Sequence, residues 1–370
     1  MQKFEWALRY MSHSEKKIFL EVSKKTDYVI LDAHFIAACE QAMANTVSKE
    51  IAGVEFVIDP KTASLNIEKR YDRKLLEAYN IDAEEEYDIK KIIENGNKEE
   101  FVSNVINFQK DKIKKITNAD PFENETESQI VPKFVIPPYL MIEEPADIEK
   151  NKELYEIAKK EEEELRPVIY LSKELLSEKT LLEETIEKIQ KEYRGDIFIW
   201  INELNAYTDD REILLAYAKI VEKLKESSIN PIAFYGSYFA LLLSKKGLGG
   251  VSHGIQFGES KGVPTEPRKG FSSIVRYYCP KLKRKYTHVI LKTLQAKGFT
   301  EITEGIPIEK DHKEAEKHFL KEREKEIIEV RTEKISLDIP ALLEKHKEKK
   351  LFEYYVPSNY LKNWEYALKT

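Results

Sequence analysis

Eight short runs of apolar, β-branched or aromatic residues recur along the chain, and most intervals between them hold a helical stretch long enough for a crossover. Most runs are almost continuously hydrophobic, which is typical of parallel strands covered on both faces. An open doubly wound sheet would show the same alternation, but eight strand–helix units are the number that closes a (β/α)8 barrel. We therefore predict an α/β fold, a TIM-like (β/α)8 barrel. The predicted strands are residues 28–31, 54–58, 134–136, 168–171, 197–201, 232–235, 251–257 and 274–278.

We expect the barrel to occupy residues 1–300 of the 370-residue chain. Residues 66–130, rich in Lys, Glu, Asp and Asn, separate two predicted strands and are too long for a simple βα loop. We interpret them as a crossover helix with a helical insertion, while a disordered linker remains the alternative for residues 120–129. Residues 301–370 predict a mostly helical C-terminal extension, whose closing aromatic residues are typical of a segment that packs onto a barrel.

Charge balance and cysteine content exclude several classes of protein. Sixty Lys and Arg against 66 Asp and Glu give a net charge of −6, so no overall basic field attracts nucleic acid or an anionic membrane. Cys39 and Cys279 are too few for a disulfide framework or a thiolate-rich zinc site, and fit a reducing compartment. The longest uncharged run, residues 227–244, is interrupted by an Asn-Pro and a Gly-Ser pair, which argues against a membrane span. We expect a cytoplasmic protein with no membrane partner, and its oligomeric state stays open.

Polar residues follow several predicted strands, and the carboxyl ends of barrel strands form the pocket of this fold. These residues are Asp32, His34, Asp59, Lys61, Tyr139, Ser172, Asn202, Glu203, Tyr235, Gly236, His253, Gln256, Glu259, Arg276 and Tyr277. Converging carboxylates suit an acid–base pair, a carboxylate nucleophile or a hard-metal site. We predict Asp59, Glu259, Asp32 and His253 as catalytic, although Asp32 and Asp59 would equally serve as caps of a helix and a turn. We assign no metal ligands and expect no cofactor, with weakly bound Mg²⁺ or Mn²⁺ left open.

Glycine is concentrated in one part of the chain: eight of its 13 glycines lie between residues 236 and 270. Glycine lets a planar base or a phosphate approach backbone N–H groups without a Cβ in the way. Gly236, Gly249 and Gly250 are therefore predicted substrate-binding residues. A tight βα turn with close helix packing is the structural alternative.

A short basic cluster follows, comprising Lys281, Lys283, Arg284 and Lys285 beside three tyrosines. Such a cluster can contact a nucleic-acid backbone locally despite the acidic total charge. We predict Lys281 and Arg284 as binding residues for a nucleic-acid partner, tRNA or DNA. A solvated start to a barrel helix is the equally weighted alternative.

The order of these motifs resembles that of the tRNA-guanine transglycosylase superfamily. Residues 58–62, Ile-Asp-Pro-Lys-Thr, stand where that family has D-S-G-G-F, and Asn202-Glu203 lies near its second base-recognising acid. Residues 235–238 resemble its Q-G-G turn, and residues 249–259 resemble its G-G-L-x-V-G-E motif. Residues 278–281 fall where the family has D-x-V-x-P-T-R, but neither the Asp nucleophile of that motif nor the C-x-C-x-x-C zinc motif is present.

The resemblance implies a barrel that binds a nucleobase or nucleotide and exchanges a glycosidic base in nucleic acid, with a carboxylate attacking C1′ as the base leaves. It places Asp59 as the general acid–base, and Asn202, Glu203, Tyr235 and the Gly249-Gly250 backbone on the purine edge. Asp32 or Glu259 would have to supply the nucleophile, so enzymatic activity itself stays open. Two alternatives remain, namely an acid–base or metal-dependent hydrolase of a small molecule and a non-catalytic nucleic-acid-associated binding protein.

Overall fold

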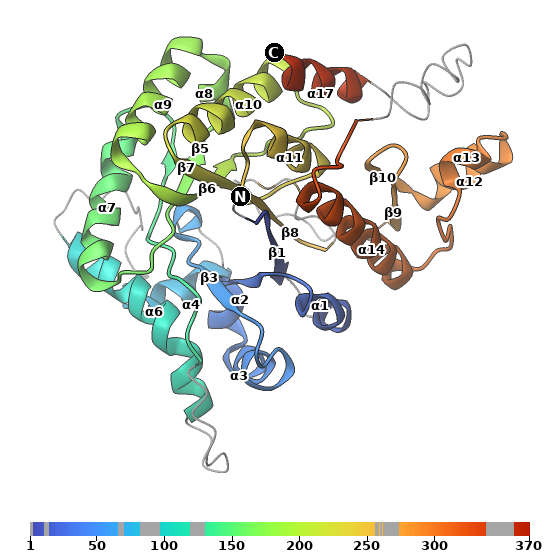
Figure 1. Ribbon diagram of the computed structural model, residues 1–370. Helices are drawn as coiled ribbons and strands as arrows, with labels where there is room; N and C mark the ends of the chain where they lie inside the picture. The colour runs from blue at the N-terminus through green and yellow to red at the C-terminus, as the bar shows by residue number, and fades with distance from the viewer. Residues whose placement is uncertain are drawn as a thin grey trace.

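In the computed structural model, residues 3–10, 15–65, 70–81, 97–118, 130–255, 259, 261, 274–337 and 359–370 are described (Figure 1). Eight parallel strands form one sheet in the order β3-β2-β1-β8-β7-β6-β5-β4. The strands are β1 (Glu5–Tyr10), β2 (Tyr28–Asp32), β3 (Phe56–Asp59), β4 (Met141–Ile142), β5 (Val168–Leu171), β6 (Gly195–Ile201), β7 (Ile229–Ala233) and β8 (Gly250–His253).

The sheet curls until its two outer strands meet. Lys133 N donates to Phe56 O of β3 at 2.8 Å, and Val135 on the same segment bridges in parallel to Leu165 ahead of β5. Further along, Thr62 Oγ1 accepts from Tyr139 N and donates to Tyr139 O, both at 2.8 Å. The predicted (β/α)8 barrel is therefore confirmed.

One barrel strand was missed, and two of the predicted strands are wrong in detail. The first barrel strand is β1, which was not predicted because Glu5 and Arg9 interrupt its apolar pattern. The run at residues 274–278 instead enters an antiparallel hairpin of β9 (Arg276–Cys279) and β10 (Arg284–Thr287) outside the barrel. The run at 134–136 contributes only the Val135 bridge, and the paired strand β4 begins after Pro137 and Pro138, which have no N–H to donate.

Helices surround the sheet (Figure 1). Up to β8 they are α1 (Lys16–Ser23), α2 (Ala33–Ala38), α3 (Glu40–Asn45), α4 (Arg70–Ala78), α6 (Lys98–Asn118), α7 (Asp147–Glu161), α8 (Lys173–Ser177), α9 (Lys179–Glu192), α10 (Arg211–Glu226) and α11 (Tyr238–Leu242). Helices α4 and α6 fall within the predicted insertion and pack against α2 and α3. Residues 66–69, 82–96 and 119–129 of that insertion lie outside the described residues.

The chain beyond β8 adds the hairpin and the helices α12 (His288–Ala296), α13 (Thr300–Thr303), α14 (His312–Arg331) and α17 (Asn359–Lys369). Asp311 caps α14, its carboxylate accepting from the backbone N–H groups of Lys313 and Glu314. Helix α14 contacts both α1 and α11, the helices after β1 and β7, so it lies where the eighth barrel helix belongs (Figure 1). The predicted division of the chain at residue 300 stays a prediction.

Helix α17 packs against α10, and its aromatic residues contact segments beside that helix. Trp364 is fully buried, and its Nε1 donates to Ala206 O at 2.7 Å.

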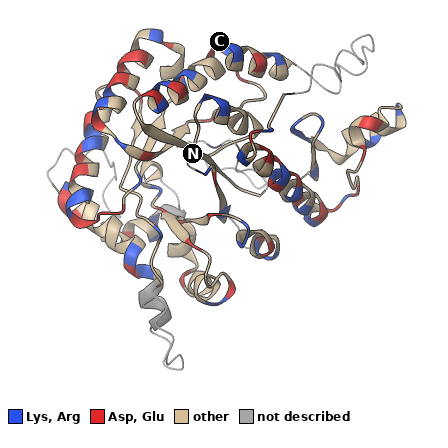
Figure 2. Ribbon diagram, in the orientation of Figure 1, with Lys and Arg blue, Asp and Glu red and all other residues tan. Residues whose placement is uncertain are grey.

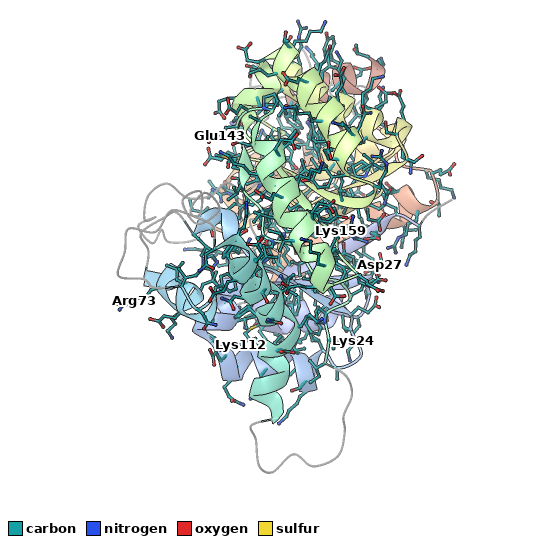
Figure 3. All side chains as sticks on the ribbon, turned by 90° about the vertical axis from the view of Figure 1, so that its left-hand side faces the viewer. Lys24, Asp27, Arg73, Lys112, Glu143 and Lys159 are labelled. Atoms are coloured by element: carbon teal, nitrogen blue, oxygen red, sulfur yellow. The ribbon has the colours of Figure 1, made fainter. Side chains whose placement is uncertain are left out.

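Lys, Arg, Asp and Glu alternate along the outer helices α7, α9 and α14 (Figure 2). Figure 3 shows the same covering from the side, with Lys112 and Lys159 on the helices α6 and α7 that face the viewer.

Inside the barrel, side chains follow the two-residue period of the strands. Tyr28 and Ile30 of β2 point into the barrel, whereas Val29 and Leu31 pack against the surrounding helices. The interior is rich in aromatic rings, among them Tyr139, Tyr170, Phe198, Trp200 and Phe234. It is a packed core, so a ligand site has to lie above it, at the carboxyl ends of the strands.

Candidate functional site at the barrel mouth

Three charged side chains form the top inward-facing layer of β1, β2 and β3. Arg9, Asp32 and Asp59 each lie two residues after an inward-facing residue of their strand, and therefore also face inward. These inward-facing residues are Ala7 on β1, Ile30 on β2 and Val57 on β3. Asp32 and Asp59 are register partners on β2 and β3. Together with Lys61, which follows β3, they form what we call the mouth network.

Asp59 is the centre of the mouth network. One carboxylate oxygen accepts from Arg9 Nη1 at 2.9 Å and lies 2.8 Å from Lys61 Nζ. The other accepts from Tyr139 OH at 2.7 Å and from the backbone N–H of Lys61 at 3.1 Å. Burial alone would raise the pKa of Asp59, but the charges of Lys61 and Arg9 outweigh it and hold that pKa well below its usual range. The carboxylate is fully buried, so it braces the site rather than exchanging protons.

Lys61 is held in place by its backbone and by all three of its donors. The residue follows Pro60 in the left-handed region, with φ of 56°, which turns the side chain back over the barrel. Its Nζ contacts Asp59, Asp32 at 3.3 Å and the Tyr235 hydroxyl at 2.5 Å. Burial lowers its pKa, but Asp32 and Asp59 overcome this and raise the pKa above its ordinary value. Lys61 therefore stays charged.

Arg9 lies between two aromatic rings, with its guanidinium carbon 4.0 Å from the ring centres of both Phe234 and Tyr235. Its Nε donates to Phe234 O at 3.2 Å and to Ser252 Oγ at 3.3 Å. Its Nη2 is buried and has no hydrogen-bond partner among the residues that the structure describes. A guanidinium held flat in this way is a fixed positive charge in the floor of the site.

Asp32 differs from Asp59 in accessibility. Among the described residues its Oδ1 is the engaged oxygen, at 3.3 Å from both Arg9 Nη1 and Lys61 Nζ. Its side chain is 12% exposed, against 0% for Asp59. Within the described part of the chain, no hydrogen bond reaches its Oδ2. Asp32 is thus the carboxylate of the network with an oxygen available for a substrate hydrogen bond, as far as the described residues show.

Lys261 is attached through its backbone to residues at the end of β6. Its backbone oxygen accepts from Trp200 Nε1 at 2.8 Å and from the Glu203 N–H at 3.1 Å. Glu203 takes a left-handed conformation, with φ of 52°, at the end of β6. Burial lowers the pKa of Lys261 to about 8, assisted by the charge of Lys61 and opposed by that of Asp32.

The predicted site residues are therefore only partly brought together. Asp32, Asp59 and Tyr235 meet at the mouth, where Asn202 Oδ1 also accepts from Tyr170 OH at 2.7 Å. Arg9 is a member of the mouth network that the sequence analysis missed, and the inward-facing row of β1 was the available signal for it. Lys261, beside the end of β6, was also missed, and no local pattern marks it.

His253 faces away from the mouth, because it follows the inward-facing Ser252 on β8. Its Nε2 accepts from Trp6 Nε1 at 3.0 Å, and its ring packs against Phe319 of α14. Burial, together with the charge of Arg323, lowers its pKa to about 3. Glu259 also points elsewhere, forming an ion pair with Arg323 of α14. Neither residue joins Asp32 and Asp59.

The glycines are explained by close packing. Gly249 and Gly250 lie at the amino end of β8, opposite the mouth. A Cβ on Gly249 would meet the Asn230 side chain at 2.1 Å, and one on Gly250 would meet Glu5 Cβ at 2.7 Å. A Cβ on Gly236, after β7, would meet Val251 Cγ2 at 2.2 Å. Gln256, Gly258, Gly262 and Gly270 lie outside the described residues.

The basic cluster is largely turned inward. Lys283 pairs with Glu326 at 3.0 Å, Lys285 Nζ lies 3.6 Å from the ring centre of Phe319, and Arg284 packs over Tyr207 and Tyr360. Of the four cations, Lys281 is the exposed one. This geometry leaves little of the cluster for a phosphate backbone.

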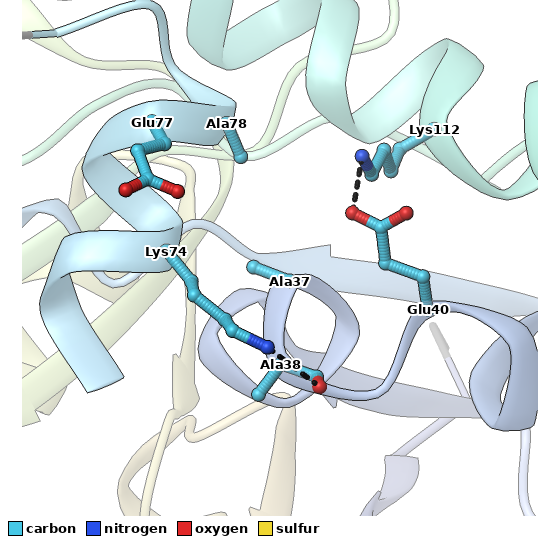
Figure 4. Close-up of a pocket in the computed structure, with 7 residues that line it drawn as sticks. All are labelled: Ala37, Ala38, Glu40, Lys74, Glu77, Ala78 and Lys112. Atoms are coloured by element: carbon cyan, nitrogen blue, oxygen red, sulfur yellow. Dashed lines mark hydrogen bonds and ion pairs between the residues drawn. The ribbon is translucent and has the colours of Figure 1, made fainter. Parts of the chain in front are cut away.

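A surface pocket of about 440 Å³ lies away from the mouth, over α2, α3, α4 and α6 (Figure 4). Its lysines are engaged, since Lys112 pairs with Glu40 at 2.5 Å and Lys74 donates to Ala38 O at 3.5 Å (Figure 4).

Across the described ranges, no three His, Cys, Asp or Glu side chains gather to hold a metal ion. No helix in those ranges has the length and apolar character needed to cross a membrane.

Comparisons with known proteins identify no family. No protein-family model matches the chain, and no curated protein matches it. Among solved structures, it is similar to the tryptophan synthase alpha subunit of Legionella pneumophila str. Paris, with 11% identity and a TM-score of 0.34 over 88% of this chain and 93% of that one. It is also similar to D-psicose 3-epimerase of Clostridium cellulolyticum H10, solved with D-tagatose, with 12% identity and a TM-score of 0.35 over 90% of this chain and 100% of that one. What stands of the expected resemblance is the TIM-barrel fold.

Proposed function

We propose that the chain is an enzyme that carries out acid–base chemistry on a small polar substrate at the barrel mouth, with Asp32 as the proton-transferring group. The observation that carries the proposal is the division of charges there. Both carboxylate oxygens of Asp59 are engaged by Arg9, Lys61 and Tyr139, whereas Asp32 Oδ2 has no hydrogen-bond partner in the described residues. Clusters of ionisable groups with perturbed pKa values, such as Asp59 and Lys61 here, are often found at catalytic sites.

Burying two carboxylates and two cations is costly, and apolar residues of similar volume are often at least as stable. A structural role alone therefore gives little reason for the network. A catalytic role explains the network better. Fixed charges around one accessible carboxylate can orient a substrate, and these charges need not rearrange during the reaction.

Base exchange in nucleic acid gains less support from the same geometry. Asp59, the expected acid–base, is enclosed by Arg9, Lys61 and Tyr139. The Gly249-Gly250 backbone lies at the opposite end of β8. The inward packing of the basic cluster also weakens the case for a non-catalytic nucleic-acid-binding protein. The test below therefore includes nucleosides and nucleic acids, so that both of these functions are examined.

The test is a thermal-shift screen of wild type and Asp32→Asn against phosphorylated sugars, 2-oxo acids, nucleosides, tRNA, single-stranded DNA and duplex DNA. A ligand at 100 times its Kd stabilises a protein by about 2.7 kcal/mol, a readily measured shift. We expect a small polar ligand to stabilise wild type and the matched control Glu324→Gln, but not Asp32→Asn. The proposal fails if Asp32→Asn keeps every ligand that wild type binds, or if only nucleic acids bind.

A further inference from the structure

The hydroxyl of Tyr235 has a hydrogen to donate at the barrel mouth. Lys61 Nζ lies 2.5 Å from the hydroxyl oxygen. A charged ammonium has no lone pair, so the hydroxyl must accept this hydrogen bond and keeps its own hydrogen for another acceptor. Within the described residues no acceptor receives that hydrogen, whereas the hydroxyl of Tyr139 donates to Asp59. Tyr235 is also the more accessible of the two tyrosines, at 8% exposed against 1%.

The ring of Tyr235 is held in a fixed position. The guanidinium carbon of Arg9 lies 4.0 Å from its ring centre, and the ring centre of Trp200 lies 5.0 Å from it. Directly after the tyrosine, the Gly236 N–H donates to Ser252 O of β8 at 2.9 Å, which fixes the backbone. Burial raises the pKa of Tyr235 to about 12, opposed by the charges of Arg9 and Lys61. The phenol is therefore protonated at neutral pH, as a proton donor has to be.

Lys61 also places Asp32 close to this hydroxyl. Asp32 Oδ1 lies 3.3 Å from the same Nζ, so it is at most 5.8 Å from the Tyr235 oxygen, the sum of the two distances to Nζ. Catalytic acids and bases reach about 2.6–3.2 Å to the atoms that they serve. One small molecule can therefore contact both groups through neighbouring atoms. Asp32 and Tyr235 have the spacing of an acid–base pair.

We propose that Tyr235 is the proton donor of the barrel mouth and acts with Asp32 to enolise a small carbonyl compound that carries a hydrogen on the carbon next to its carbonyl group. This inference rests on the proposed function, because Asp32 is the base. It adds a second catalytic residue and the substrate class.

The step balances with these two residues. Asp32 removes the proton from the carbon next to the carbonyl, and the electron pair of that C–H bond forms the C=C bond. The π pair of the carbonyl moves onto its oxygen, which takes the proton of Tyr235. The Tyr235 phenolate is stabilised by the ammonium of Lys61. Return of both protons regenerates the two residues, so the step needs no oxidant, reductant or further reactant.

The cations beside Tyr235 favour a reaction in which negative charge develops on oxygen. Lys61 touches the hydroxyl and Arg9 lies against the ring, and the pKa of each is raised above its ordinary value, so both stay charged. Fixed positive charges stabilise an enolate or a phenolate. The same charges oppose the oxocarbenium-like transition state through which a glycosidic bond is hydrolysed. The geometry therefore favours a carbonyl substrate over a glycoside.

Hydrogen–deuterium exchange tests the inference with three probes: pyruvate, hydroxyacetone and dihydroxyacetone phosphate. Each probe is incubated with the protein in D2O, and loss of the C–H signal beside the carbonyl is followed by proton NMR. We expect wild type to exchange at least one probe faster than protein-free buffer does. Tyr235→Phe keeps the ring against Arg9 and should lower that rate at least about 100-fold. The matched variant Tyr366→Phe, which alters an exposed tyrosine of α17, should leave it unchanged.

A second readout separates catalysis from a structural role. Tyr235→Phe should retain wild-type circular dichroism and should still be stabilised by the probe in thermal unfolding, because Asp32 and Lys61 are intact. The loss is therefore expected in kcat rather than in KM. A Tyr235→Phe rate close to that of wild type, or no wild-type exchange with any of the three probes, would overturn the inference.

The two proposals fail separately. Exchange that Asp32→Asn abolishes but Tyr235→Phe keeps refutes the role of Tyr235 and leaves the proposed function standing. Asp32-dependent ligand binding without exchange refutes the enolisation and also leaves the proposed function standing. Exchange that is as fast in Asp32→Asn as in wild type refutes the role of Asp32, and with it both proposals.

Discussion

Replacing Asp59 by asparagine tests whether the mouth network is as tightly coupled as its distances indicate. Asparagine preserves the shape of the side chain and one oxygen acceptor. That oxygen can still accept from Tyr139 OH and from the Lys61 N–H. The amide nitrogen then faces Arg9 Nη1 and Lys61 Nζ, which in wild type lie 2.9 and 2.8 Å from a carboxylate oxygen.

The cost follows from these contacts. Two charge-assisted interactions are lost, each contributing about 1.5–3 kcal/mol. Two buried cations then share Asp32 alone, and breaking a buried ion pair from one side costs about 3–5 kcal/mol. We expect the free energy of unfolding of Asp59→Asn to fall by about 3–5 kcal/mol, because the two figures describe the same loss.

Urea unfolding followed by tryptophan fluorescence measures this loss, provided that the m-value stays constant between variants. The control is Glu324→Gln, which removes an exposed pair with Lys25 at 2.7 Å and should cost at most about 1 kcal/mol. If Asp59→Asn cost no more than this control, the coupling of Asp59 to Arg9 and Lys61 would be refuted.

Three further predictions concern the barrel and its outer layer. Gly250→Val should lower the stability by about 1–3 kcal/mol, because a Cβ there meets Glu5 of β1, and a melting temperature equal to wild type would contradict this. Unfolded chains bind a proton at His253 that the folded protein excludes down to about pH 3, so stability should fall as the pH drops below about 6.5. His253→Gln should flatten that slope in urea titrations between pH 6.5 and 4, where an unchanged slope would count against it. Trp364→Ala should cost about 3–5 kcal/mol in thermal unfolding, since the ring is fully buried between α17 and the barrel, and a cost below about 1 kcal/mol would show that α17 is not docked.

The sequence was sufficient to predict the barrel because most of its strands are buried on both faces. The strand predicted at residues 168–171 matches β5, Val168–Leu171, residue for residue. Strand β1 was missed because its two charged side chains occupy inward-facing positions. Glu5 lies near the bottom of the barrel, paired with Arg166, and Arg9 lies at the top in the mouth network. Local hydrophobicity cannot distinguish such a strand from a surface segment.

The site was predictable where it depends on strand ends and unpredictable where it depends on packing between distant segments. Asp32, Asp59 and Tyr235 follow from the rule that carboxyl ends of barrel strands form the pocket. Gly250 was misread because the atom that excludes a side chain there belongs to Glu5, at the other end of the sequence. Ser252 and His253 are neighbours on β8, so their side chains point to opposite faces of the strand. The sequence prediction gave the strand but did not determine which of the two residues faces inward.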